Sequence, residues 1–201
     1  MKDLVVLVAD KNMQATLRGA LARPEALEIR PISFDFRVHP GQDGGARTSG
    51  PAVLATEHRR FSHALLILDL EGSGSNTVDP VEQEHDLDAR LSLQWKDRAK
   101  SVVIAPELDA WMWGSDNALR DVFRWPRNGS IRDWLLAEGF KFDAAGKPVR
   151  PKEALEAMVR VHRQARSSAL YEKVAAKISL KRCKDAAFVR LRSQLQRWFG
   201  S

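Results

Sequence analysis

The feature that most constrains the fold is a set of three short apolar runs, each of which ends in acidic residues. The longest run, residues 63–74, leads from aliphatic side chains into Asp69 and Glu71, and the other two cover residues 4–10 and 101–109. Uninterrupted apolar runs of this length are typical of strands that are buried on both faces. The sequence therefore predicts an α/β fold with a mostly parallel sheet flanked by helices, followed by a helical C-terminal part.

Four acidic residues follow these runs at the places where parallel strands end. Asp10 ends the first run, Asp69 and Glu71 end the second, and Glu107 follows the third. Ligands of open α/β sheets bind outside the carboxyl ends of the strands, so we expect these carboxylates to converge. They would repel each other unless a cation joined them, and hard oxygen ligands suit Mg²⁺ or Mn²⁺. The sequence thus predicts a metal site of Asp69, Glu71 and Glu107, with Asp10 and Glu107 as candidate catalytic groups.

The overall composition favours a cytoplasmic protein without a membrane anchor. Of the 201 residues, 44% are hydrophobic and 29% are charged, and no apolar run approaches the roughly 20 residues that cross a bilayer. The N-terminal apolar stretch is broken by Asp10 and Lys11, which a signal peptide would not contain. The single cysteine, Cys183, excludes an intrachain disulfide and favours a reducing compartment.

Charge is distributed unevenly along the chain. Residues 147–201 contain 14 Lys and Arg against 4 Asp and Glu, a net charge of +10, whereas residues 1–146 contain 18 against 22, a net charge of −4. We therefore expect an α/β domain at residues 1–145 and a basic helical extension at residues 146–201 that packs on it. A basic surface beside acidic strand ends suits a metal centre next to bound DNA, although solvated basic helices give the same pattern. The candidate nucleic-acid-binding residues are Lys177, Lys181, Arg182, Lys184 and Arg190.

Helical spacing and turn signals divide the rest of the chain. A helix is expected at residues 12–22 with Asn12 as its N-cap, and four more at residues 130–138, 151–165, 167–178 and 184–199. Residues 37–51 are rich in glycine and are expected to form a long loop, from which His39 and Asp43 could reach the site. An ordinary surface loop is the alternative.

The order of strands and acidic residues resembles the TOPRIM domain of topoisomerases, primases and certain phage-defence nucleases. Asp10, the motif Asp69-Leu-Glu71 and Glu107 carry this resemblance. TOPRIM proteins usually present a Glu-Gly pair after the first strand, where this chain has Ala9-Asp10. Asp10 either replaces that glutamate with a shorter reach, or the general acid or base is absent.

A second resemblance covers most of the chain and rests on a set of short phrases. The set is similar to a small TOPRIM-like family that belongs to the methylation-associated phage-defence system of bacteria, and it consists of residues 63–74, 106–113, 150–153, 167–171 and 183–188. This resemblance implies a subunit of an antiviral restriction-type system that acts together with other subunits.

Three functions are compatible with these features. The first is a Mg²⁺-dependent DNA nuclease or nuclease-like subunit, in which Asp69, Glu71 and Glu107 hold the metal and Asp10 orients or deprotonates the nucleophile. The second is a catalytically inactive TOPRIM-like adaptor that binds DNA or partner subunits, which the missing Glu-Gly pair and the six tryptophans favour. The third is a phosphohydrolase acting on nucleotides, which would use the same acids.

Overall fold

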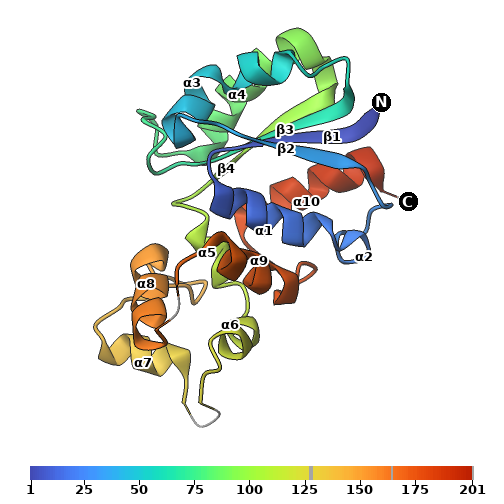
Figure 1. The fold of residues 1–201 in the computed structure, drawn as a ribbon. Coiled ribbons are helices and arrows are strands. Elements are labelled where there is room, and N and C mark those ends of the chain that lie inside the picture. Colours follow the sequence, from blue (N-terminus) through green and yellow to red (C-terminus); the bar gives the residue numbers. More distant parts are fainter. Residues whose placement is uncertain (127–128, 164, 201) are drawn as a thin grey trace.

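A four-stranded parallel sheet with the strand order β2-β1-β3-β4 forms the centre of the molecule (Figure 1). The computed structural model describes residues 1–126, 129–163 and 165–200. The strands are β1 (Lys2–Val8), β2 (Phe34–Val38), β3 (Phe61–Asp69) and β4 (Ala99–Ile104). Each pairing within this sheet is parallel, so the predicted α/β fold with a mostly parallel sheet is confirmed.

Burial explains the near-continuous aliphatic sequence of the two central strands. In β1 and β3 the residues from Leu4 to Val8 and from Ala64 to Leu68 are at most 1% exposed, because helices cover both faces of the sheet. The edge strand β2 is only half-buried and starts after Pro31, which has no N–H to donate to a ladder.

Helices cover the sheet on both faces (Figure 1). Helices α1 (Lys11–Leu21) and α10 (Ala186–Phe199) lie on one face, and α3 (Gln42–Ala55) and α4 (Pro80–Trp95) lie on the other. The chain leaves β1 toward the first face and leaves β3 toward the second. Because β1 and β3 are neighbours, the connections that follow them diverge at the carboxyl edge of the sheet.

The prediction of a long loop at residues 37–51 is wrong, because most of this segment belongs to helix α3. Its glycines are contact points rather than chain breakers. A Cβ at Gly45 would lie 2.5 Å from the His39 ring, and one at Gly50 would lie 2.9 Å from a Leu66 methyl group. Small residues at these positions let the helix approach the sheet closely. The glycines in this segment therefore serve close packing of a helix instead of marking a loop. Pro51 lies inside the same helix.

The helices between residues 109 and 177 form a layer that extends away from the sheet below α1 and α10 (Figure 1). Helix α9 packs along α1, α8 contacts α5, and α6 contacts α9. The four helices expected in the C-terminal half are present with slightly shorter bounds. The elements not yet named are α2 (Pro24–Leu27), a 3₁₀ helix (Lys96–Arg98), α5 (Asp109–Met112), α6 (Asp116–Val122), α7 (Ile131–Ala137), α8 (Pro151–Val161) and α9 (Ser168–Lys177).

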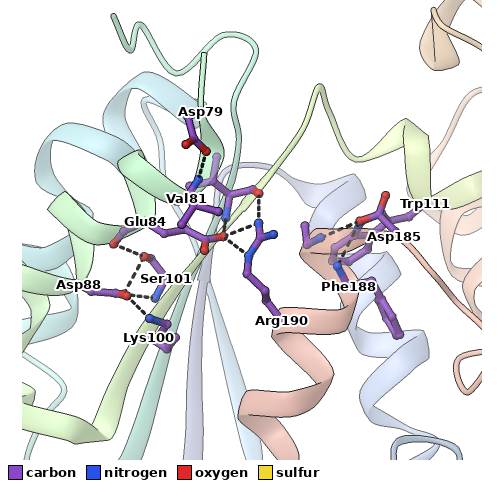
Figure 2. Close-up of polar contacts among 12 residues, drawn as sticks. Asp79, Val81, Glu84, Asp88, Lys100, Ser101, Trp111, Asp185, Phe188 and Arg190 are labelled. Atoms are coloured by element: carbon purple, nitrogen blue, oxygen red, sulfur yellow. Dashed lines mark hydrogen bonds and ion pairs between the residues drawn. The ribbon is translucent and has the colours of Figure 1, made fainter. Parts of the chain in front are cut away.

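Carboxylates of α4 complete the hydrogen bonding of the edge strand β4 (Figure 2). Asp88 Oδ1 accepts the backbone N–H of Ser101 at 2.7 Å, and Glu84 Oε1 accepts that of Val103 at 2.8 Å. Arg190 of α10 donates to the same Glu84 oxygen at 2.8 Å and to the Val103 carbonyl at 3.2 Å. The free edge of β4 is thus covered by side chains instead of being left open for pairing with another strand.

Candidate functional site

The candidate site lies at the carboxyl edge of the sheet between β1 and β3. In α/β sheets a ligand crevice opens where the connections of two neighbouring strands leave in opposite directions, as they do here. Val8 pairs with Ile67 across β1 and β3, so Asp10 and Asp69 follow the two central strands at the same level. Asp69 also pairs with Ile104 of β4, which brings the segment containing Glu107 to the same edge.

Asp69 is fixed by backbone hydrogen bonds on two sides. Its Oδ1 accepts the N–H of Leu108 at 2.9 Å, and its own N–H donates to Asp43 Oδ1 at 2.7 Å. Beyond the end of β3, the chain runs beside the segment that follows β4, since the Glu71 N–H donates to the Pro106 carbonyl at 3.0 Å. These contacts connect the end of β3, the first turn of α3 and the segment after β4.

Three carboxyl groups of the site have raised pKa values, chiefly because they are buried and in part because other carboxylates lie nearby. Burial raises the pKa of Asp69 well above its usual range, and the charges of Asp43, Asp10 and Glu107 raise it further. Burial also raises the pKa of Asp43, with a further contribution from Asp10. The pKa of Glu107 rises to about 7 through burial and the neighbouring Asp109 and Glu71 charges.

The two remaining predicted acids lie at the rim of this group. Asp10 is exposed and is the N-cap of α1, where its Oδ1 accepts the N–H of Met13 at 2.7 Å. The N-cap predicted at Asn12 is therefore wrong by two residues. Glu71 is exposed beside Glu107. Asp10 and Glu71 thus face solvent, whereas Asp69 and Glu107 form the more buried part of the site.

Asp43 and His39, which the sequence suggested as optional members of the site, have different roles. Asp43 joins the site through Asp69. His39 is buried and has both ring nitrogens engaged, because Nδ1 accepts the N–H of Gly41 at 3.0 Å and Nε2 lies 2.9 Å from Ser49 Oγ. His39 therefore supports the start of α3 and does not face the carboxylates.

Lys152 is a member of the site that sequence reasoning missed. Its Nζ lies 3.8 Å from Glu107 Oε2, and its charge lowers the pKa values of both Glu107 and Asp43. Lys152 sits in the first turn of α8, 45 positions after Glu107, and only the folded chain brings the two together. The sequence feature that could have pointed to Lys152 is its position in residues 150–153, one of the short phrases that carry the resemblance described for the sequence.

A second, buried hydrogen-bond network lies next to the site, and no sequence pattern indicated it. Asp109 Oδ1 accepts the Tyr171 hydroxyl at 2.8 Å, and Arg166 donates to Asp109 Oδ2 at 3.0 Å and to the Tyr171 oxygen at 2.9 Å. Burial raises the pKa of Tyr171, and the Asp109 charge raises it further. This network joins α5 to α9 two residues beyond Glu107.

The donor set fits a hard divalent cation by its chemistry. It offers only carboxylate oxygens, and a cation would favour the charged form of Asp69 and Glu107, whose pKa values are raised by burial and further by the neighbouring carboxylates. Within residues 1–126, 129–163 and 165–200, however, no three His, Cys, Asp or Glu side chains are arranged so that they could share one ion. An ion would have to draw the carboxylates together.

The predicted nucleic-acid-binding residues fall into two groups. Three are in ion pairs: Lys177 with Asp121, Lys181 with Glu28 at 3.3 Å, and Arg190 with the buried Glu84. Arg182 and Lys184 are exposed, and within the described part of the chain neither forms an ion pair. These last two are therefore free to bind a phosphate, whereas Arg190 connects α10 to the edge of the sheet.

Comparisons with protein-family models, with curated proteins and with solved structures find no match to this chain. Within the described residues, no helix combines the length and the apolar character that crossing a membrane requires.

Proposed function

We propose that this chain is a metal-dependent DNA nuclease subunit of an antiviral restriction-type defence system, acting in the cytoplasm with other subunits. The observation that carries the proposal is the placement of Asp69 and Glu107 at the switch point of the sheet with raised pKa values. The resemblance of five sequence phrases to a TOPRIM-like defence family supports the biological setting.

The roles of the acids follow from their surroundings. Asp69, Glu71 and Glu107 would hold Mg²⁺ or Mn²⁺, which when bound would stabilise the charge that develops on the phosphate. Without a metal ion the pKa of Glu107 is about 7, so the group would suit general acid or base catalysis wherever it acts through a bound water instead of ligating the ion directly. Asp10 faces solvent across from Asp69 and would orient the attacking water.

Positive charges near the acids would bind the DNA backbone. Lys152 lies beside Glu107 and would contact the phosphate that is cleaved. Arg182 and Lys184 are exposed and available for neighbouring phosphates. Binding through such contacts weakens steeply as salt is raised, because each phosphate contact releases counterions.

Cleavage of supercoiled plasmid and linear DNA, with Mg²⁺ or Mn²⁺, tests the proposal. Asp69→Asn should lower the rate by at least about 100-fold, because it removes a charge on which the cation depends. Glu138→Gln is the matched control, since Glu138 is exposed at the end of α7 and belongs to no part of the site. Equal cutting by wild type and Asp69→Asn would refute the assignment.

A catalytically inactive adaptor is the second candidate, and one observation favours it. The Asp10 carboxylate is already engaged as the N-cap of α1, at the position where TOPRIM enzymes carry their glutamate. Calorimetric titration with Mg²⁺ separates the two candidates. Heat of binding that disappears in Asp69→Asn supports the nuclease, whereas DNA binding without any metal binding supports the adaptor.

A further inference from the structure

A groove of about 790 Å³ lies next to the carboxylate site and is not used by the proposed chemistry. Its walls are the end of β4, the turn at residues 143–149 and the segment at residues 182–186 that leads into α10. Pro106 and Pro151 also line it, and these residues directly precede Glu107 and Lys152. The groove therefore adjoins the part of the candidate site that contains Glu107 and Lys152.

The lining residues of the groove carry a net positive charge. Arg182 and Lys184 line it, and within the described residues no ion pair neutralises either. Lys147 and Asp185 line it too, but they pair with each other at 2.7 Å. The exposed Asp143 accepts the backbone N–H of Lys147 at 2.8 Å and keeps its charge, so the lining carries three cations against two carboxylates, a net charge of +1. A phosphate in the groove would meet two available cations.

The groove is also held in shape by contacts below its surface. Asp185 caps α10 and accepts the Trp111 Nε1–H at 2.9 Å, as Figure 2 shows. Trp113 lines the groove with a half-buried ring, and its Nε1–H donates to the Pro151 carbonyl at 3.1 Å. Its orientation is thereby fixed, and a fixed indole face is a platform on which a nucleobase can stack.

We propose that this groove holds a short unpaired segment of the DNA strand next to the phosphate that is cleaved, so that the preferred substrate is single-stranded or has a single-stranded end. Its volume lies within the range of about 300–1,000 Å³ that holds a drug-sized ligand. Such a space would hold a few nucleotides of one strand, and the Trp113 ring can stack only on a base that is unpaired and turned out of a duplex. This inference rests on the proposed function, because it assigns the substrate of the same site.

Fluorescence anisotropy with a labelled single-stranded oligothymidylate and a duplex of equal length, in EDTA, tests the inference without cleavage. The double variant Arg182→Ser/Lys184→Ser should bind the single strand at least about 10-fold more weakly than wild type. Trp113→Leu should cause a loss of about 5-fold or more, through lost stacking. The control is Arg59→Ser/Arg197→Ser, which removes two exposed cations near the other end of the sheet and should leave single-strand binding unchanged. Thermal melting verifies that each variant is folded.

The outcomes separate this inference from the nuclease assignment. A selective loss of single-strand binding in the groove variants supports the inference, even if the wild type cuts no DNA and the nuclease assignment fails. Equal losses for single strand and duplex would overturn it, because the groove would then be a general DNA surface. Unchanged binding in the groove variants would also overturn it, whatever the cleavage assay shows.

Discussion

Asp43 Oδ1 accepts the backbone N–H of Asp69 at 2.7 Å, which ties the first turn of α3 to the end of β3. The contact places a second carboxylate beside one that is already buried, and the charge of Asp43 adds to the effect of burial in raising the pKa of Asp69. The free protein is thus built with more negative charge at one point than its local environment stabilises. Its stability should therefore depend on pH and on divalent cations.

Stability should fall as pH rises from about 4.5 to about 7 in the absence of metal. The pKa of Glu107 is raised from 4.5 to about 7, so the folded state binds a proton that the unfolded state has released in this range. The resulting stabilisation is complete below pH 4.5 and is lost as pH passes 7. Glu107→Gln should flatten this dependence by about 1–2 kcal/mol, after allowance for solvent screening. Urea unfolding at several pH values measures it, and parallel curves for both proteins would contradict it.

Removal of the Asp69 charge should stabilise the metal-free protein at pH 7.5 and abolish its response to cations. In Asp69→Asn the side-chain oxygen can still accept the Leu108 N–H, while the buried charge next to Asp43 and Glu107 is gone. The variant should therefore melt at a higher temperature than wild type in EDTA. Added Mg²⁺ or Mn²⁺ should raise the melting temperature of wild type alone. A wild type that gains nothing from either ion would count against the metal site.

Arg190 should contribute to folding rather than to DNA binding. Its guanidinium lies 2.8 Å from Glu84 Oε1, and the Glu84 side chain is 5% exposed, so Arg190→Met leaves a buried carboxylate without its partner. The expected cost is about 3–5 kcal/mol in the free energy of unfolding. Arg197→Met on the same helix is the control, because Arg197 is exposed, and it should change stability by less than about 0.5 kcal/mol.

The double variant Glu84→Gln/Arg190→Met separates charge from packing. The glutamine oxygen can still accept the N–H of Val103, and no buried charge remains. Most of the stability lost in Arg190→Met should return. If the double variant is as unstable as the single one, the aliphatic contacts of Arg190 carry its contribution instead.

The strands and the position of the acidic residues were predictable because both depend on local sequence. An aliphatic run followed by an acid places a carboxylate at a sheet edge, whichever strands become neighbours, and Asp69 and Glu107 met in this way. The contribution of Lys152 was not predictable from residue type or spacing, since its place in the phrase at residues 150–153 does not indicate that α8 approaches that edge. Charge alone also could not distinguish Arg190, which faces Glu84, from Arg182, which faces solvent.

The glycines of residues 37–51 were misread as loop residues because their packing role depends on tertiary contacts. Substitutions at Gly44 and Gly45 test whether close packing explains the glycine at position 45. A Cβ at Gly45 would lie 2.5 Å from the His39 ring, which is held by Gly41 and Ser49 and cannot move aside. A Cβ at Gly44 would lie 3.7 Å from the nearest atom, an ordinary contact distance. Both positions are helical, so the helix-forming advantage of alanine applies to both and only the packing differs.

Gly44→Ala should therefore stabilise the protein by about 0.5–1 kcal/mol, because alanine loses less backbone entropy on folding than glycine does. Gly45→Ala should destabilise it by roughly 1–3 kcal/mol, since the added methyl group displaces a buried ring. Urea unfolding of the two variants provides a direct comparison at adjacent positions of one helix. Equal stabilisation by both would mean that close packing against His39 does not explain the glycine at position 45. Opposite signs would show that the glycine at position 45 permits close packing of a helix against the His39 ring.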